Sequence, residues 1–186
     1  GNYQMMVDRG RMTQEQKDMV LGLITPTLSY DDLSDVDIAV EAVYENLELK
    51  QEIFKSLDAV TKSHAILASN TSGLDIDAIA ASTNRPEKVV GTHFFSPANV
   101  MRLLEVVRGK DSSDETMATV MSIGKKMGKA AVVSLNAPGF IGNRMLAGYT
   151  HQANMLLLEG ALPNQVDSAL ESCLLYTSPS PRDLRK

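Results

Sequence analysis

Short apolar segments alternate with longer amphipathic segments along most of the chain. Five apolar segments are predicted to form strands: Val36–Val43, Ala65–Ala68, Val89–Phe95, Leu103–Val107 and Ala131–Leu135. Amphipathic segments around them are predicted to form helices: Thr13–Ile24, Glu45–Val60, Asp75–Ser82 and a segment from Ser112 to Gly128. This alternation is typical of an α/β protein with a mostly parallel, doubly wound sheet.

Local signals set the predicted helix ends and faces. Thr13 and Gln16 fit a T-x-x-Q capping box, and Ser112 and Glu115 fit a second box. Gly128 follows two lysines at the end of that second helix, where a glycine commonly ends a helix. The apolar stripe of the helix at 45–60 is predicted from its spacing as Leu49, Ile53, Leu57 and Val60.

The pattern changes after the last predicted strand. A helix is predicted from Pro138 to about Leu158, with Gly160 as its stop, and another begins near Pro163. Two successive helices without a strand between them indicate an all-helical domain. We therefore place a domain boundary near Asn136, with residues 1–136 in the α/β domain and 137–172 at the start of the helical one.

The segment Cys173–Lys186 differs in character from the rest. Its first eleven residues match, codon by codon, the translation of an adapter used in transposase-based sequencing libraries. A Ser/Pro-rich tail or linker is the alternative. We interpret residues 173–186 as a non-native addition and exclude them from the prediction of the fold.

Composition narrows the function classes. The formal net charge is −5, and the excluded tail is itself basic, so a nucleic-acid or anionic membrane surface is not expected. No apolar run reaches the ~20 residues of a membrane span, and no signal peptide is apparent. The single cysteine lies in the tail, so neither disulfides nor a metal site is predicted. We expect a soluble, intracellular protein.

Three short motifs carry the candidate chemistry: Ser69–Ser72 (SNTS), Gly91–Pro97 (GTHFFSP) and Pro138–Arg144 (PGFIGNR). Each places polar side chains just after a predicted strand or at the start of a predicted helix, where open α/β sheets bind ligands. The second motif contains His93, and Glu105 follows it in the next apolar run. This pair would supply a general base and the carboxylate that orients it.

Each candidate also has an ordinary structural interpretation. A lone histidine at a strand end is more often structural, and Glu105 would be unremarkable on a solvent-facing edge strand. A carboxylate within the apolar run LLEVV needs a partner if it is buried, which favours the functional interpretation. Ser72 would otherwise be a turn or cap residue, and Asn143 a polar helix position. Only their occurrence together with His93 favours a catalytic role.

Four segments resemble, in order and spacing, the L-3-hydroxyacyl-CoA dehydrogenase family: VEAVYENLELKQEIF, ILASNTSGL, GTHFFSPANVMRLLEVVRG and APGFIGNRML. The resemblance spans Gly1–Ser172. It implies an NAD-binding Rossmann domain, a helical domain that forms dimers, and oxidation of (S)-3-hydroxyacyl-CoA to 3-oxoacyl-CoA in fatty-acid β-oxidation. The forms HFFSP and GFIGNR are more similar to the dehydrogenase part of multifunctional hydratase–dehydrogenases than to stand-alone enzymes.

The resemblance also implies residue roles. The family's catalytic histidine corresponds to His93, with Glu105 as its partner. Ser72 and Asn143 correspond to residues that bind the 3-oxygen and the thioester region of the substrate. The family's NAD contacts correspond to Glu45, Lys50, Ser72 and Ser96. Considered alone, Glu45 is an acid that favours a helix start, and Lys50 is a solvent-facing helix residue.

The sequence departs from the family in one respect. It contains no G-x-G-x-x-G turn, so we expect an incomplete Rossmann-type sheet that lacks its first two strands, in a fragment that is inactive alone. The parent protein would act on acyl-CoA as a homodimer or as part of a multifunctional chain. Its expected location is the bacterial cytoplasm or, in a eukaryote, the peroxisome or mitochondrial matrix.

Three alternatives stay open. A stand-alone 3-hydroxybutyryl-CoA dehydrogenase would share the same motifs. A different Rossmann dehydrogenase, acting on a hydroxyacid or a nucleotide sugar, would commonly use a lysine or cysteine base, for which no motif occurs. A non-catalytic relative would be favoured by loss of His93 or Glu105, but both are present.

Overall fold

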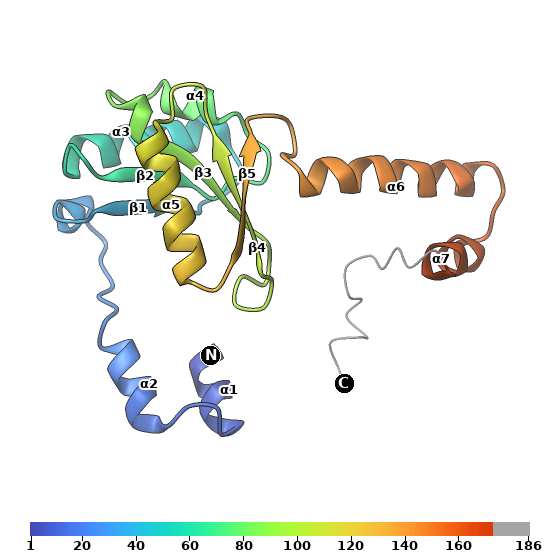
Figure 1. The fold of residues 1–186 in the computed structure, drawn as a ribbon, viewed down its shortest axis with the longest axis horizontal. Helices are drawn as coiled ribbons and strands as arrows, with labels where there is room; N and C mark the ends of the chain where they lie inside the picture. Colours follow the sequence, from blue (N-terminus) through green and yellow to red (C-terminus); the bar gives the residue numbers. More distant parts are fainter. Residues whose placement is uncertain (173–186) are drawn as a thin grey trace.

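The computed structural model describes residues 1–172, so the hypothesis about residues 173–186 lies outside the described residues. Its centre is a five-stranded sheet of β1 (Ile38–Glu41), β2 (Ile66–Ser69), β3 (Val89–Phe94), β4 (Leu103–Arg108) and β5 (Ala130–Leu135), in that order (Figure 1). β1, β2 and β3 run parallel, and so do β4 and β5, whereas β3 and β4 are antiparallel. The predicted mostly parallel sheet is confirmed.

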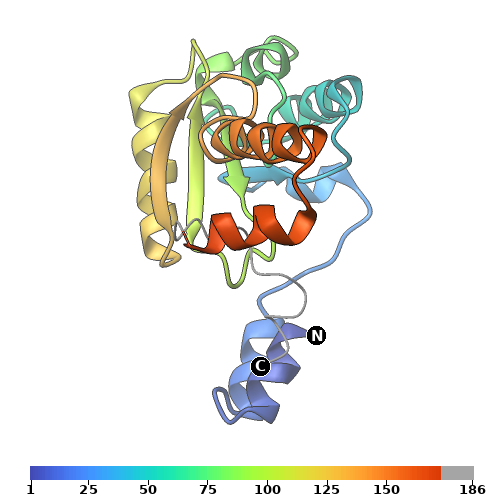
Figure 2. The same cartoon turned by 90° about the vertical axis from the view of Figure 1, so that its right-hand side faces the viewer.

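Helices cover both faces of the sheet, as a doubly wound arrangement requires. The helices are α3 (Leu47–Val60), α4 (Ile76–Ala80) and α5 (Asp114–Lys126), and two 3₁₀ turns lie at Tyr30–Leu33 and Pro86–Lys88. α3 and α4 pack on one face, around Phe54, Ile76 and Val107, and α5 packs on the other, around Met117 and Val106. Figure 2 shows the sheet between these two layers. Because side chains alternate along a strand, β1 to β4 each contribute to both cores, whereas β5 contributes Ala131 to the core under α5.

Two predicted helix features differ in the structure. α5 has Ser113 as its N-cap, not Ser112, because the Ser112 hydroxyl is buried and donates to the Val89 carbonyl oxygen. The buried face of α3 consists of Lys50, Phe54 and Leu57. Of the predicted stripe only Leu57 is fully buried, and Ile53 is partly buried against the same core, in which Phe54 is the fully buried aromatic residue of this helix.

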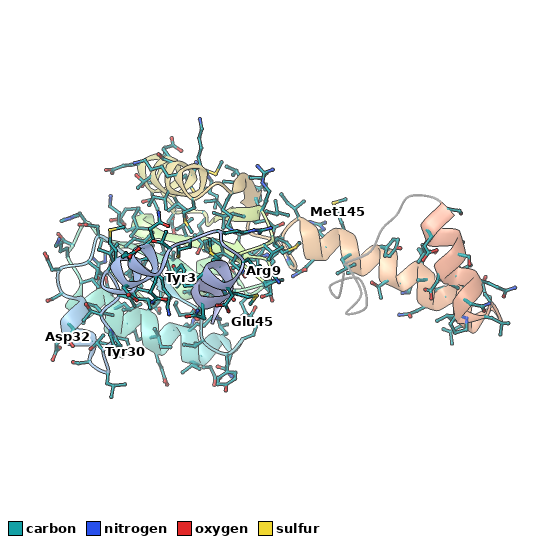
Figure 3. All side chains as sticks on the ribbon, turned by 90° about the horizontal axis from the view of Figure 1, so that it is seen from below. Tyr3, Arg9, Tyr30, Asp32, Glu45 and Met145 are labelled. Atoms are coloured by element: carbon teal, nitrogen blue, oxygen red, sulfur yellow. The ribbon has the colours of Figure 1, made fainter. Side chains whose placement is uncertain are left out.

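The remaining helices extend from the α/β unit. They are α1 (Asn2–Asp8), α2 (Gln14–Leu21), α6 (Gly142–Leu158) and α7 (Pro163–Ser172). α2 has the predicted capping box at Thr13, and none of the residues of α1, α2 or α6 is buried. Figure 3 shows exposed Met145 on α6, beyond the sheet. Within residues 1–172, no helix is long and apolar enough to span a membrane.

The predicted start of α6 at Pro138 is wrong by four residues. Residues 138–141 form a turn instead, with left-handed backbone at Gly139 (φ +71°) and Phe140 (φ +49°). A left-handed residue cannot continue a right-handed helix, so α6 begins only at Gly142. This turn carries residues 139–143 back across the end of the sheet, where they contact the candidate site.

Candidate active site

His93 and Glu105 lie directly opposite each other on the antiparallel strands β3 and β4. His93 Nδ1 is 2.7 Å from Glu105 Oε2, and the two side chains are 7% and 0% exposed. β4 is an interior strand, so the alternative of a solvent-facing edge residue is wrong for Glu105. A directly opposed pair has the shortest side-chain separation that two strands offer, which explains how strand register alone brings these groups together.

The other oxygen of Glu105 joins the sheet to α6. Oε1 accepts hydrogen bonds from the Ile141 N–H (3.0 Å) and the Gly142 N–H (2.7 Å) at the start of that helix. Free N–H groups at a helix N-terminus favour a negative charge. The buried carboxylate predicted to need a partner therefore has three.

Aromatic rings enclose His93. The Phe95 ring centroid lies 4.3 Å from that of His93, and the Phe140 centroid lies 5.9 Å away. Phe140 is buried and belongs to the same apolar core as Phe54 and Ile76. The rings exclude water from most of the imidazole, so His93 has a fixed orientation and little solvent access.

Ser72 and Asn143 are in contact beside the turn at residues 138–141. Asn143 Nδ2 donates to the Ser72 carbonyl oxygen at 3.1 Å. Beside this contact, a Cβ at Gly73 would lie only 3.1 Å from the Gly139 nitrogen, so the two backbones approach closely. Asp75, not Ser72, caps α4, and Ser72 lies in the bend before that helix, so the alternative of a cap residue is wrong and that of a turn residue stays open.

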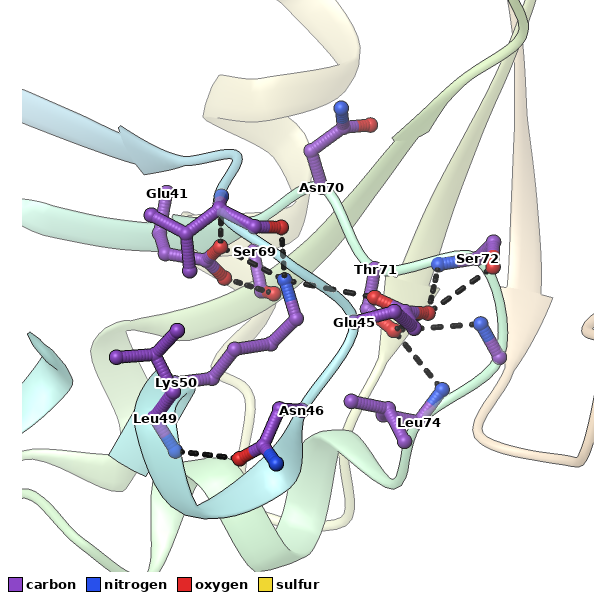
Figure 4. A network of polar contacts seen from close by, with 12 residues as sticks. Glu41, Glu45, Asn46, Leu49, Lys50, Ser69, Asn70, Thr71, Ser72 and Leu74 are labelled. Carbon is purple, nitrogen blue, oxygen red and sulfur yellow. Dashed lines mark hydrogen bonds and ion pairs between the residues drawn. The ribbon is translucent and has the colours of Figure 1, made fainter. Parts of the chain in front are cut away.

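Glu45 holds Thr71 and Ser72, the second half of the Ser69–Ser72 motif (Figure 4). Its Oε1 accepts from the Thr71 hydroxyl (2.6 Å), the Ser72 N–H (2.7 Å) and the Ser72 hydroxyl (3.0 Å). Partial burial alone would raise the pKa of the Glu45 carboxyl. The hydrogen bonds from Thr71 and Ser72, together with the charge of Lys50, outweigh burial and lower that pKa below the usual value of a glutamate.

Lys50 is fully buried, so its interpretation as a solvent-facing helix residue is wrong. Its Nζ lies 2.7 Å from Glu41 Oε1 and 3.5 Å from Glu45 Oε2. Ser96, the remaining predicted cofactor contact, is exposed in the loop after β3. The structure thus places Glu45, Lys50 and Ser72 in one network, to which no contact joins Ser96 among the described residues.

Sequence reasoning missed two polar residues at this edge of the sheet. Asn70 Oδ1 accepts from the Phe94 N–H at 2.9 Å and fastens the end of β3 next to His93. Glu41 is a buried carboxylate within the apolar run VDIAVEAV, and the argument applied to Glu105 would have found it. Within residues 1–172, no group of three or more His, Cys, Asp or Glu side chains is placed to hold a metal ion.

Comparison with protein families covers nearly all of this structure. Residues 1–137 match the model of the 3-hydroxyacyl-CoA dehydrogenase NAD binding domain, and residues 139–177 match that of the 3-hydroxyacyl-CoA dehydrogenase C-terminal domain. The chain belongs to the 3-hydroxyacyl-CoA dehydrogenase family. The division at residues 136 and 172 remains a prediction.

Known relatives agree with this membership. The chain is 56% identical over 151 residues to a peroxisomal bifunctional enzyme of Danio rerio, covering 81% of this chain and 21% of that protein. It is 47% identical over 165 residues to the fatty acid oxidation complex subunit alpha of Colwellia psychrerythraea, covering 89% and 23%. The chain therefore spans about a fifth of the length of these relatives.

A solved structure with a stated substrate matches as well. The (S)-3-hydroxybutyryl-CoA dehydrogenase of Ralstonia eutropha superposes with a TM-score of 0.91 at 36% identity. The match covers 94% of this chain and 62% of that one.

Proposed function

We propose that this chain supplies the catalytic residues for NAD-dependent oxidation of an (S)-3-hydroxyacyl-CoA to the 3-oxoacyl-CoA. The observation that carries the proposal is the buried His93–Glu105 contact of 2.7 Å between β3 and β4. Family membership and the (S)-3-hydroxybutyryl-CoA dehydrogenase neighbour support the same reaction class.

Glu105 sets the role of His93 in this proposal. An ionised carboxylate only accepts hydrogen bonds, so the contact with Oε2 makes His93 Nδ1 the donor. The lone pair on Nε2 is then available to accept the proton of the substrate hydroxyl as hydride leaves the same carbon. Glu105 stabilises the resulting imidazolium, as the aspartate does in a Ser–His–Asp triad.

Ser72 and Asn143 would orient the substrate. Ser72 is exposed, and its hydroxyl is held by Glu45 Oε1. Asn143 uses one N–H on the Ser72 carbonyl, which leaves its second N–H and its amide oxygen for other partners. Both side chains are therefore fixed, while the Ser72 hydroxyl oxygen can still accept a hydrogen bond and Asn143 can still donate one and accept one, towards the 3-oxygen and the thioester region.

The polar groups at the ends of β1 and β2 fit the nicotinamide–ribose half of NAD, which supplies the hydride acceptor when bound. Glu45, with its side chain 40% exposed, presents a carboxylate that suits ribose hydroxyls. Ser72 presents a hydroxyl beside it, and Ser96 is exposed in the loop after β3. Lys50 is buried, so it would contribute to cofactor binding indirectly, through the positive charge that it places beside Glu45.

The relatives' names suggest partners and location. We propose an acyl-CoA substrate, and a place for this segment in a multifunctional chain or in a homodimer. Bifunctional peroxisomal enzymes and bacterial fatty acid oxidation complex subunits are among the relatives, which supports the peroxisome of a eukaryote or the bacterial cytoplasm. The names of these relatives lend no support to the mitochondrial matrix.

The proposal is tested in an exchange enzyme. This is the Ralstonia eutropha enzyme in which the matching segment is replaced by residues 1–172 of this chain, so that the other 38% of that enzyme stays its own. NADH formation is followed with (S)- and (R)-3-hydroxybutyryl-CoA, with the unexchanged enzyme alongside. Oxidation of the (S) substrate is expected. A folded exchange enzyme, verified by circular dichroism, that oxidises neither substrate would refute the proposal.

A further inference from the structure

Glu41, a buried carboxylate without a role in the proposed reaction, lies beside the candidate cofactor contacts. It is the last residue of β1, and its side chain is 0% exposed. Oε1 accepts from Lys50 Nζ (2.7 Å) and the Val43 N–H (2.6 Å), and Oε2 accepts from the Ser69 hydroxyl (2.7 Å). Buried charges occur in proteins when they are paired and hydrogen-bonded, and Glu41 meets both conditions.

The Lys50 ammonium lies between two carboxylates of different exposure (Figure 4). It is 2.7 Å from Glu41 Oε1 but 3.5 Å from Glu45 Oε2, and the side chain of Glu45 is 40% exposed. Lys50 Nζ also lies 3.4 Å from the Val43 carbonyl oxygen. Glu41 thus takes the short contact with the cation, and Glu45 takes the long one.

This division leaves Glu45 free to hold Thr71 and Ser72. Its Oε1 accepts three hydrogen bonds from Thr71 and Ser72. Without the negative charge of Glu41, Coulomb attraction would draw the ammonium of Lys50 onto Glu45. The cation would then compete with the Thr71 hydroxyl and with both Ser72 groups for the same carboxylate.

We infer that Glu41 is a positioning residue, which holds the Lys50 ammonium away from Glu45 and thereby keeps Glu45 in place to orient Ser72. The inference rests on the proposed function, in which Ser72 contacts both substrate and cofactor. It assigns the Ser69 hydroxyl a supporting role, because Ser69 fixes the second oxygen of Glu41.

The first test uses the full chain and needs no activity. Lys50 is buried and Lys126 is exposed, so acetylation by acetic anhydride, followed by peptide mass spectrometry, compares the two sites. Glu41→Gln is expected to raise acetylation of Lys50 relative to Lys126 severalfold, because the ammonium moves to the more exposed Glu45. An unchanged ratio would overturn the inference.

Asp58→Asn is the matched control for that experiment. Asp58 forms an ion pair with Arg85 (Oδ1 to Nε, 2.7 Å), with side chains 7% and 8% exposed. Its loss also leaves a buried charge unpaired, far along α3 from the candidate site. Acetylation of Lys50 should not change in this variant. An equal rise in both variants would mean general loosening of the fold and would count against the inference.

The second test measures kinetics in the exchange enzyme. Glu41→Gln is expected to lower kcat/KM for NAD about tenfold, which corresponds to about 1.4 kcal/mol. The effects of Glu41→Gln and Ser72→Ala should not be additive, since one acts through the other. Asp58→Asn should lower the melting temperature with little change in kcat/KM. Additive effects of Glu41→Gln and Ser72→Ala would overturn the inference.

Two further results keep the inference separate from the proposed function. If Glu41→Gln does not fold, Ser69→Ala removes one hydrogen bond to the carboxylate and should change Lys50 acetylation and kcat/KM in the same directions. If the unsubstituted exchange enzyme is folded but inactive, the proposed function fails. The acetylation ratio of Lys50 in the full chain then still decides the positioning role of Glu41.

Discussion

Replacing Glu105 by glutamine changes one oxygen of the site into an amide nitrogen. The remaining oxygen of Glu105→Gln would stay with the Ile141 and Gly142 N–H groups, which hold Oε1 at 3.0 and 2.7 Å. The new NH₂ group would then face His93 Nδ1, and two donors cannot share one hydrogen bond. The imidazole is expected to carry its proton on Nε2 instead, where it cannot accept the proton of the substrate.

The expected loss in kcat of the exchange enzyme is therefore roughly 10²–10⁴-fold, the usual contribution of a general base. Glu105→Gln should also lower the free energy of unfolding by about 1.5–3 kcal/mol, the contribution of one hydrogen bond to a charged group. Steady-state NADH formation and a thermal melt measure the two effects. Glu115→Gln is the control, because Glu115 pairs with Lys88 while 79% exposed. A Glu105→Gln enzyme with near-normal kcat would refute the reasoning.

Three further predictions concern the full chain. ¹⁵N NMR, assigned by comparison with His93→Gln, should show His93 protonated on Nδ1 at neutral pH; protonation on Nε2 alone would contradict the orienting role. Gly91→Ala should destabilise by about 1–3 kcal/mol in urea unfolding, because its Cβ would lie 2.7 Å from that of Val107, whereas Gly148→Ala, with open space around it, should not. The hydrogen bond from Asn136 is the main cause that lowers the pKa of Asp75. The stability from that contact is present above the usual aspartate pKa and is lost as the pH falls through the lowered value. The difference in unfolding free energy between wild type and Asn136→Ala should therefore become smaller in acid. A difference that does not change with pH would contradict this prediction.

All five strands could be predicted because each is a short apolar run with clear ends. The exact helix ends could not be predicted, because they depend on tertiary packing and on backbone conformation. Ser112 and Ser113 are adjacent candidates for the same cap. Only the packing of α5 on the sheet shows that the Ser112 hydroxyl donates to the Val89 carbonyl oxygen instead. The start of α6 was predicted too early because the backbone of Phe140 is left-handed, which a phenylalanine seldom adopts.

The candidate site was predictable where a single residue carried a strong constraint. Glu105 lies in an apolar run, so its burial and its need for a partner followed from the sequence. The burial of Lys50 could not be predicted, because lysine is rarely buried and its partner Glu41 lies on a different element. The contacts from the start of α6 to Glu105 depend on the turn at 138–141, which has no counterpart in the pattern of apolar positions.

The rate of the His93→Gln exchange enzyme tests the central claim most directly. His93 is the proposed base, and glutamine keeps a polar side chain of similar size without a basic nitrogen. The account predicts that kcat for oxidation of (S)-3-hydroxybutyryl-CoA falls roughly 10²–10⁴-fold, with a much smaller change in KM. A folded His93→Gln enzyme that turns over at the rate of the unsubstituted exchange enzyme would contradict the account.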